Sequence, residues 1–235
     1  MGSFLLAALV AGSVFAQQLA TTPANRNDQA WWKKRFEEKQ ALVKQGGWEL
    51  VFMGDSITHG WEGGGKEVWA QNFAQYKALN LGYGGDRTEH VLWRLDNGEL
   101  DGYQPKLLVL MIGTNNTGHR PLAQESPEDT AAGIKAILDK IGKKSPNTRV
   151  LLLAVFPRGA KPDEEKRVRN DKVNALIKGY ADGKRVIFLD LNKEMLGPDG
   201  TLAKEMMPDF LHPQAKGYAI WAKAITPIVK ETLGK

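Results

Sequence analysis

The stretch Trp48-Glu-Leu-Val-Phe-Met53, followed directly by Gly54-Asp55-Ser56-Ile57, decides the fold. The first part is a short apolar run of the kind that forms a buried strand. Ser56 stands in the turn that leaves this strand, and open α/β sheets bind their ligands in the crevice at the carboxyl ends of the strands. The sequence therefore predicts a serine at the ligand-binding edge of a sheet.

Two further segments follow apolar runs and should reach the same edge. They are Asn80-Leu-Gly-Tyr-Gly-Gly-Asp86, after the run that begins at Ala78, and Gly113-Thr-Asn-Asn116, after Leu107–Ile112. Acyl transfer needs hydrogen-bond donors aimed at the oxygen that becomes negative in the tetrahedral intermediate. A glycine turn exposes a backbone N–H, and a side-chain amide supplies the same group. Gly85 and Asn115 are the candidate donors.

The segment Asp209-Phe-Leu-His212, far downstream, supplies the other groups of a hydrolytic triad. A serine nucleophile needs a base to take its proton and a carboxylate to orient that base. Residues three apart in a tight turn or first helical turn lie on one side, so Asp209 and His212 can act together. We predict Ser56 as nucleophile, His212 as base and Asp209 as the orienting carboxylate.

The rest of the chain alternates strand and helix patterns, which predicts a parallel sheet covered by helices on both faces. We expect one three-layer α/β/α domain over residues 28–235 with a five-stranded parallel sheet. The chain lacks a Gly-x-Ser-x-Gly elbow, which argues against the larger α/β-hydrolase fold. Strands are expected at Glu49–Met53, Ala78–Leu81, Leu107–Ile112, Arg149–Val155 and Arg185–Leu189, and helices at Asp28–Lys44, Lys66–Gln75, Arg87–Leu95, Ser126–Lys144, Glu164–Tyr180 and Ala215–Leu233.

The amino terminus has the pattern of an export signal. Phe4–Ala11 has the length of a secretory apolar region, and Val14-Phe-Ala16 resembles a cleavage site. We expect residues 1–16 to be a signal peptide, residues 17–27 to be a polar tether, and the protein to be exported. The alternative for this segment is a buried amino-terminal helix or an anchor.

The composition of the chain favours a globular domain and argues against several other classes of protein. With 235 residues, 42% of them hydrophobic and 25% charged, the chain suits a domain with a substantial core. The net charge is +5, but basic and acidic residues alternate, as on solvated helix faces and unlike a nucleic-acid-binding stripe. No apolar run is long enough for a membrane span, and there is no cysteine. No metal-ligand spacing such as His-Glu-x-x-His appears, so neither a metal nor another cofactor is expected.

The four segments around Ser56, Gly85, Asn115 and His212, in this order, resemble the SGNH (GDSL-type) hydrolase family. The resemblance runs from about Trp48 to about Tyr218. It is closest to the branch that contains the catalytic subunits of intracellular platelet-activating-factor acetylhydrolase. The runs that carry this similarity are Gly84–Leu100, Gly113–Asn116, Phe156–Gly159 and Asp209–His212.

This resemblance implies a flavodoxin-like SGNH fold and the roles given above for Ser56, Gly85, Asn115, Asp209 and His212. It implies the backbone N–H of Ser56 as a third oxyanion donor. It also implies a small acyl site, crowded by Thr114 and Leu211 and, by its position, Ile57. In that branch the proteins form dimers, so a homodimer is a further expectation. His119 should lie near the same edge and could line the substrate cleft, with ordinary surface polarity as the alternative. Arg87 could also reach substrate from the start of its helix.

Three functional hypotheses follow from these residues. The first is a serine esterase that removes acetyl groups, with O-acetylated carbohydrate as the expected substrate of an exported enzyme. The second is a lipid esterase or lysophospholipase, which would prefer longer acyl chains. The third is a catalytically silent carbohydrate-binding module that kept the fold, although binding alone requires neither a triad nor oxyanion donors.

Overall fold

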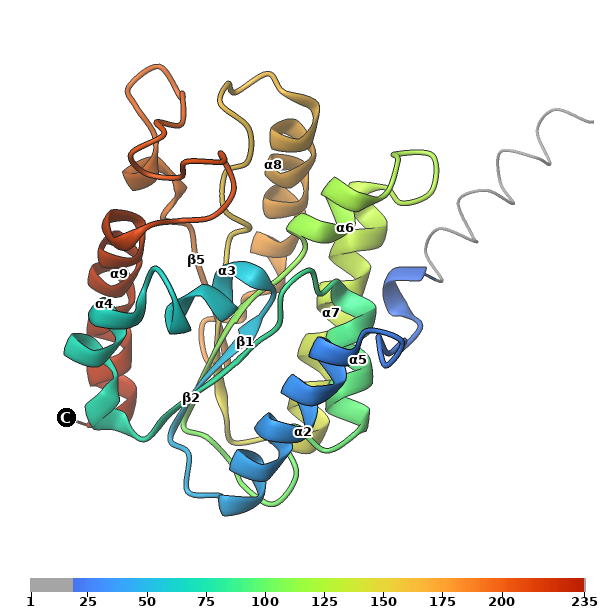
Figure 1. Cartoon of the computed structure of the whole chain (residues 1–235), viewed down its shortest axis with the longest axis vertical. Coiled ribbons are helices and arrows are strands. Elements are labelled where there is room, and N and C mark those ends of the chain that lie inside the picture. The colour runs from blue at the N-terminus through green and yellow to red at the C-terminus, as the bar shows by residue number, and fades with distance from the viewer. Residues whose placement is uncertain (1–18, 235) are drawn as a thin grey trace, which may run out of the picture.

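The computed structural model describes residues 19–234 of the chain (Figure 1). Its centre is a sheet of five parallel strands in the order β2-β1-β3-β4-β5. The strands are β1 (Leu50–Gly54), β2 (Ala78–Gly82), β3 (Leu107–Met111), β4 (Arg149–Leu153) and β5 (Val186–Leu189). Each strand lies within two residues of its predicted bounds.

Eight helices connect or cover the strands in the described part of the chain. They are α2 (Ala30–Gln45), α3 (Ser56–His59), α4 (Lys66–Asn72), α5 (Thr88–Asp96), α6 (Thr114–His119), α7 (Pro127–Lys144), α8 (Glu165–Ile177) and α9 (Ala215–Leu233). The six longer ones were predicted, and the Ser126 cap with Pro127 at the first position starts α7 as expected. The short helices α3 and α6 were not predicted, because four to six residues are too few to show a helical period.

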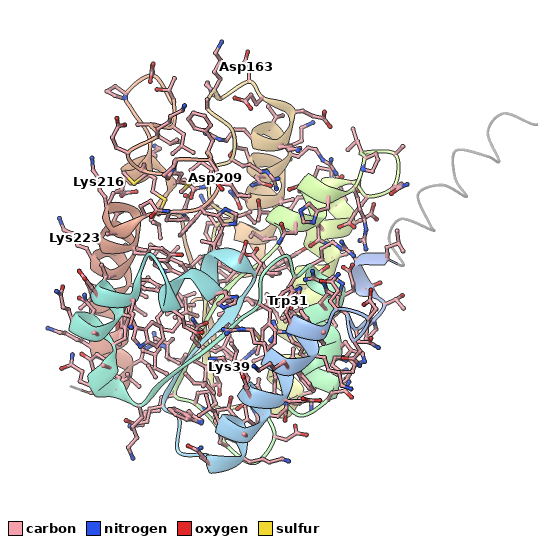
Figure 2. All side chains as sticks on the ribbon, in the orientation of Figure 1. Trp31, Lys39, Asp163, Asp209, Lys216 and Lys223 are labelled. Carbon is pink, nitrogen blue, oxygen red and sulfur yellow. The ribbon has the colours of Figure 1, made fainter. Side chains whose placement is uncertain are left out.

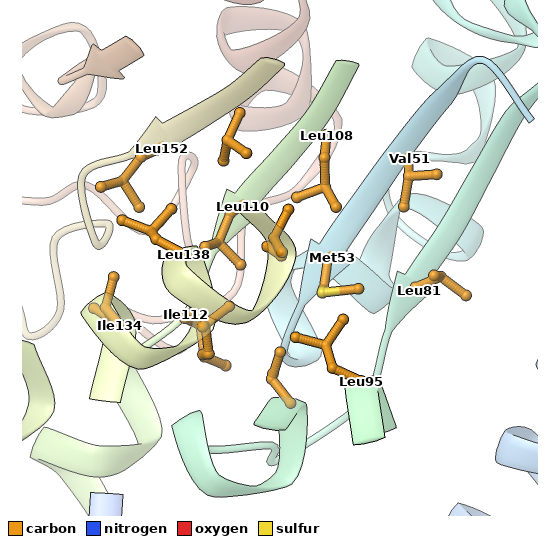
Figure 3. Close-up of a cluster of buried hydrophobic side chains, with 14 of the residues drawn as sticks. Val51, Met53, Leu81, Leu95, Leu108, Leu110, Ile112, Ile134, Leu138 and Leu152 are labelled. Atoms are coloured by element: carbon orange, nitrogen blue, oxygen red, sulfur yellow. The ribbon is translucent and has the colours of Figure 1, made fainter. Parts of the chain in front are cut away.

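The sheet is buried on both faces because alternate residues of each strand point to opposite sides. Val51 and Met53 of β1 face a core formed with α2, α5, α7 and α8, part of which is drawn in Figure 3. Leu50 and Phe52 face a second core, formed with α4 and α9 and rich in aromatic rings such as Trp61 and Trp221. The predicted three-layer α/β/α architecture is confirmed.

The strand order reverses between β1 and β3, and this reversal positions the site. Chain connections leave the two neighbouring strands in opposite directions there, which opens a crevice at their carboxyl ends. Ser56 follows β1, Asn115 follows β3, and Gly85 follows β2, which is the other neighbour of β1. The fold therefore brings these three residues to one edge.

The tether prediction is wrong for the part of residues 17–27 that the structure describes. Ala20 is fully buried, and its carbonyl oxygen accepts a hydrogen bond from the Thr88 hydroxyl at 2.9 Å. The Ala24 N–H donates to the Glu89 carbonyl oxygen at 3.1 Å. These contacts pack the segment against helix α5 at the carboxyl edge of the sheet. The predicted signal peptide, residues 1–16, lies outside the described residues.

Candidate active site

Ser56 is held at the edge of the sheet by a close turn between β1 and α3. A Cβ atom on Gly54 would collide with the Met111 carbonyl oxygen and the Thr58 hydroxyl, so only glycine fits at the end of the strand. Asp55 then caps α3, because its Oδ1 accepts a hydrogen bond from the Ile57 N–H at 2.9 Å. Ser56 is the first residue of the helix, where a backbone N–H has no partner within the helix.

Ser56, His212 and Asp209 form one hydrogen-bonded chain. Ser56 Oγ lies 2.8 Å from His212 Nε2, and His212 Nδ1 lies 2.6 Å from Asp209 Oδ2. Asp209 Oδ1 accepts from the backbone N–H of His212 at 2.8 Å. A carboxylate only accepts, so the neutral imidazole carries its proton on Nδ1 and turns the Nε2 lone pair toward the serine.

The surroundings of Asp209 keep its carboxyl group ionised. Burial would raise the pKa of the carboxyl, but hydrogen bonds from the His212 backbone, the His212 ring and the Leu211 N–H outweigh it. The pKa of Asp209 therefore stays below its usual range, and the group is an anion at neutral pH. An anion at this position favours the imidazolium that forms whenever His212 takes a proton.

The loop that carries Asp209 and His212 is fixed from helix α8. Phe210, between the two residues, has a left-handed backbone with φ of +55°. The Gly159 N–H donates to the Phe210 carbonyl oxygen at 2.9 Å, and Arg167 donates to the Gly159 carbonyl oxygen at 2.7 Å. Helix α8 thus holds a turn that a non-glycine residue adopts only under constraint.

Gly85 lies in a turn after β2, with a left-handed φ of +70° that favours glycine. Arg26, from the amino-terminal segment, donates to the Gly84 carbonyl oxygen at 2.6 Å. A Cβ on Gly85 would lie 3.1 Å from the Arg26 guanidinium. Among residues 19–234, no oxygen accepts a hydrogen bond from the Gly85 N–H, so this donor is available to a ligand.

Asn115 is buried near the start of α6, with 2% of its surface exposed. Its Nδ2 donates to the Asp86 carbonyl oxygen at 3.0 Å, which fixes the amide against the Gly85 turn. An amide nitrogen has two hydrogens, so one remains for a ligand. Asn116 has a structural place instead, because it bonds the Thr88 N–H at 3.1 Å and Glu125 at 2.7 Å.

A buried ion network lies under the Gly85 turn. Asp86 accepts from Arg94 Nε at 2.9 Å and from Trp32 Nε1 at 2.7 Å. Arg94 also forms an ion pair with Glu99, and its guanidinium lies 3.9 Å from the centre of the Tyr83 ring. Burial raises the pKa of Asp86 to about 6, although Arg94 and Trp32 oppose the shift. The network anchors the turn to helices α2 and α5.

Asp55 is the least compensated acid of the site. It is 1% exposed, and its Oδ2 has no hydrogen-bond partner among the described residues. Burial raises its pKa to about 7, the nearby Asp86 adds to the shift, and Arg158 opposes it.

This shift predicts how the stability of the protein depends on pH. Between pH 4 and 7 the folded state keeps the Asp55 proton that the unfolded chain loses, so the folded state is progressively destabilised as pH rises, by at most about 1.4 kcal/mol per pH unit. We expect Asp55→Asn to remove this slope while keeping the cap. In urea unfolding, the free energy of unfolding of Asp55→Asn relative to the wild type should be higher at pH 7 than at pH 5. The control Asp163→Asn, at an exposed position, should show no such increase. Parallel curves for the wild type and Asp55→Asn would contradict the shift.

The predicted substrate-binding residues occupy two places. Ile57 is 1% exposed in the core beside α9, and Leu211 packs against the same core. Thr114 is also buried, and its carbonyl oxygen accepts from Arg158 at 2.8 Å. His119, the exposed last residue of α6, lies apart from them and lines a cleft with Gly85.

The arginines whose contacts hold the site in place were not predicted from the sequence. Arg26 stands in the segment predicted as a tether, and Arg94 is an ordinary helix residue by pattern. The run Phe156–Gly159 was noted for its resemblance, but no role was given to Arg158. Arg26 also bonds Gln29 at 2.8 Å, but no local pattern in the sequence indicates this contact.

Residues 19–234 contain no group of three or more His, Asp or Glu side chains placed to hold a metal ion. In the same range, none of the helices has the length and apolar character needed to cross a bilayer.

A hydroxyl, an imidazole and a carboxylate connected in this way, at the crevice of an open parallel sheet, are typical of hydrolases with a serine nucleophile. The sequence matches the profile of the GDSL-like Lipase/Acylhydrolase family over residues 52–220. It is 38% identical over 188 residues to the platelet-activating factor acetylhydrolase IB subunit alpha1 of Homo sapiens, an alignment that covers 80% of this chain and 78% of that protein. The chain belongs to the GDSL-like lipase/acylhydrolase family, and it is a carboxylic ester hydrolase.

Solved structures share the fold at lower identity. A putative platelet activating factor protein from Streptococcus pneumonia aligns with a TM-score of 0.65 and 23% identity, over 85% of this chain and 95% of that one. Axe2, an acetylxylan esterase from Geobacillus stearothermophilus, aligns with a TM-score of 0.62 and 16% identity, over 81% and 95%. Est24, a carbohydrate acetylesterase from Sinorhizobium meliloti, aligns with a TM-score of 0.59 and 18% identity, over 77% of this chain and 98% of that one.

Proposed function

We propose that the protein is a serine esterase that removes acetyl groups from O-acetylated carbohydrates. The observation that carries this proposal is the chain of hydrogen bonds from Ser56 Oγ through His212 to Asp209, at 2.8 and 2.6 Å. Beside it lie two donors, the Gly85 N–H and one Asn115 amide hydrogen, that the described residues leave free.

In the proposed reaction His212 Nε2 takes the Ser56 proton while Oγ attacks the acetyl carbonyl carbon. The carbonyl oxygen becomes negative and accepts from the N–H groups of Ser56 and Gly85 and from the Asn115 amide. The imidazolium then protonates the leaving sugar alcohol, which leaves an acetyl-serine. Water, deprotonated by the same imidazole, hydrolyses this intermediate and restores the Ser56 hydroxyl.

The mechanism predicts a large loss of rate in Asn115→Ala. Removing one oxyanion donor costs roughly 10²- to 10³-fold in kcat, because the donor acts on the charge that develops in the transition state. KM for an acetyl ester should change much less. Asn116→Ala is the matched comparison: it removes a buried amide that bonds only protein groups. A larger loss of kcat in folded Asn116→Ala than in Asn115→Ala would contradict the assignment.

The preference for acetyl rests on packing around the serine. Ile57 is directly next to Ser56, and Leu211 is next to His212. Ile57 is buried in the second core, and Leu211 packs partly buried against the same core. Longer acyl chains would have to displace these side chains, whereas an acetyl group adds a single methyl. We therefore expect rate to fall steeply with acyl length.

An exposed indole near the Gly84–Gly85 turn supports a carbohydrate as the alcohol part of the ester. Trp31, labelled on helix α2 in Figure 2, is 46% exposed, which is unusual for a large apolar side chain. Its ring lies 3.5 Å from the position of a Cβ on Gly84 and is held by the Arg26 guanidinium at 5.3 Å. A flat apolar face beside the Gly84–Gly85 turn suits stacking on a sugar ring. Two of the structural neighbours are described as carbohydrate acetylesterases, although at this identity they support only the fold.

A second candidate is a lipid esterase, favoured by the name of the relatives that are 38% identical. It requires an apolar path for a long chain. The cleft beside Gly85 is lined mainly by polar side chains, which supports the first candidate.

Chain length and carrier can be tested together. We expect kcat/KM to fall from p-nitrophenyl acetate through butyrate to octanoate, and acetate to be released from acetylated xylo-oligosaccharides. A rise with chain length, together with acetate or acyl release from phospholipids alone, would contradict the proposal in favour of a lipid esterase. Absence of turnover with every ester would favour a silent binding module.

Export and dimerisation remain predictions from the sequence and the family resemblance. Cleavage after Ala16 would give a secreted or periplasmic chain that starts at Gln17, which amino-terminal sequencing of the recovered protein can check. Light scattering in solution can decide between a monomer and a homodimer.

A further inference from the structure

A cleft of about 410 Å³ lies beside Gly85, between the amino-terminal segment and the start of helix α5. Three arginines (Arg26, Arg87 and Arg120) and two histidines (His90 and His119) line it. Gly85, a candidate oxyanion donor, belongs to the same lining, so a group bound in this cleft would lie beside that donor. The acyl side of the site, beside Ile57 and Leu211, lies elsewhere.

The tautomer of His90 is fixed by its surroundings. The ring is 3% exposed, and its Nδ1 accepts the Arg87 backbone N–H at 2.9 Å. A backbone N–H can only donate, so Nδ1 carries no proton. Burial, followed by the charges of Arg87, Arg26, Arg94 and Arg120, lowers the pKa of His90 to about 2, so the ring is neutral. Its single proton is therefore on Nε2.

The Nε2–H of His90 lacks an acceptor among the described residues. The nearest polar atom is Nη2 of Arg87 at 3.5 Å, which is itself a donor and cannot accept. Oε1 of Glu89 is 3.8 Å away, beyond hydrogen-bond distance. Two donors thus face each other across a gap that one ligand oxygen could bridge. Buried donors in proteins almost always have an acceptor, so this geometry points to a ligand.

The charge of the cleft indicates what kind of oxygen fits. The three lining arginines are paired with carboxylates: Arg26 with Asp86, Arg87 with Glu89, and Arg120 with both Glu89 and Glu125. Even so, burial and then the charges of Arg87 and Arg26 lower the pKa of His90, and the pKa of His119 is lowered by burial and then by Arg158, Arg87 and Arg26. Both imidazoles therefore sense a positive field, which favours an anionic oxygen over a hydroxyl.

We propose that Arg87 and His90 form a subsite for the carboxylate of an acidic sugar, such as a uronic acid, on the alcohol side of the ester. This inference rests on the proposed carbohydrate esterase function and specifies its substrate. One carboxylate oxygen would accept from His90 Nε2 and Arg87 Nη2, which lie 3.5 Å apart. A sugar fits better than a phospholipid, because Leu19 and Ala24 are the only apolar side chains among the described residues that line the cleft.

The direct test compares two substrates of nearly the same shape that differ in this charge: a methyl 3-O-acetyl-glucuronoside with a free carboxylate, and its uncharged carboxamide. Charge-assisted hydrogen bonds predict a preference of roughly 10- to 100-fold in kcat/KM for the acid. Arg87→Ala should bring the preference close to one, and Arg87→Lys should restore part of it. The control Arg149→Ala, which removes a half-buried arginine paired with the exposed Glu231, should keep the preference. Equal rates on both substrates in the wild type, or an undiminished preference in Arg87→Ala, would overturn the subsite.

An inhibition experiment distinguishes failure of the proposed carbohydrate esterase function from failure of the carboxylate subsite. If neither sugar ester is hydrolysed while p-nitrophenyl acetate is, carbohydrate esterase activity is refuted, and inhibition of p-nitrophenyl acetate turnover decides the subsite. Glucuronate should then inhibit more strongly than glucose, and Arg87→Ala should abolish the difference. Equal inhibition by glucuronate and glucose would overturn the subsite. Stronger inhibition by glycerophosphocholine than by glucuronate would overturn the carboxylate in favour of a lipid phosphate.

Discussion

Replacing Ser56 with alanine is expected to lower kcat for p-nitrophenyl acetate by roughly 10⁴-fold or more, the loss typical of removing a serine nucleophile. The variant keeps the fold, because Ser56 Oγ bonds only His212 at 2.8 Å. His212→Ala should lose about as much, since without a base the hydroxyl is a poor nucleophile. The double variant should be little worse than either single one, because the two residues act as a unit.

Steady-state kinetics with a matched serine variant give the comparison. Ser126→Ala removes the cap of α7 and should cost about 1 kcal/mol of stability without changing kcat. Retention of most of the activity in Ser56→Ala, or a double variant whose loss is the product of the two single losses, would contradict a serine–histidine unit.

Replacing Arg94 with alanine is expected to destabilise the protein by about 3–5 kcal/mol, because it leaves two buried acids without their partner. Arg94 is fully buried, forms an ion pair with Asp86 at 2.9 Å and pairs with Glu99. Its guanidinium also covers the Tyr83 ring. Since Asp86 follows Gly85, a variant that still folds should also lose order in the Gly85 turn, and kcat should fall with it.

Urea unfolding of Arg94→Ala and of Arg149→Ala, which removes an arginine nearer the surface, measures this effect directly. An exposed ion pair such as Arg149–Glu231 contributes only about 0–1 kcal/mol. Similar losses of unfolding free energy in the two variants would mean that the buried network does not anchor the turn.

Much of the fold and the reacting residues could be predicted from the sequence, for identifiable reasons. The strands are short runs of apolar residues, such as Leu107–Met111, which a sheet buried on both faces requires. Ser56, Gly85 and Asn115 each follow such a run, and the topology of a parallel sheet brings strand ends to one edge. Asp209 and His212 are close in sequence, so a single turn determines their pairing.

The supporting contacts could not be predicted, because they join segments that are distant in sequence. Arg26 reaches Gly84 across 58 positions, and nothing in the polar segment around it indicates a packed conformation. The same holds for the Trp32–Asp86 hydrogen bond, which links positions 54 apart. Nothing in the sequence distinguishes His90 within its helix, and only the position of Arg87 Nη2 reveals the unpaired Nε2–H.

Covalent trapping tests the central claim most directly. Incubation with diethyl p-nitrophenyl phosphate, followed by peptide mass mapping, should place one diethylphosphoryl group on Ser56, in step with loss of esterase activity. Ser56→Ala should remain unlabelled, and His212→Ala should label far more slowly. Full inactivation with the label on another residue, or with Ser56 unmodified, would contradict Ser56 as the nucleophile.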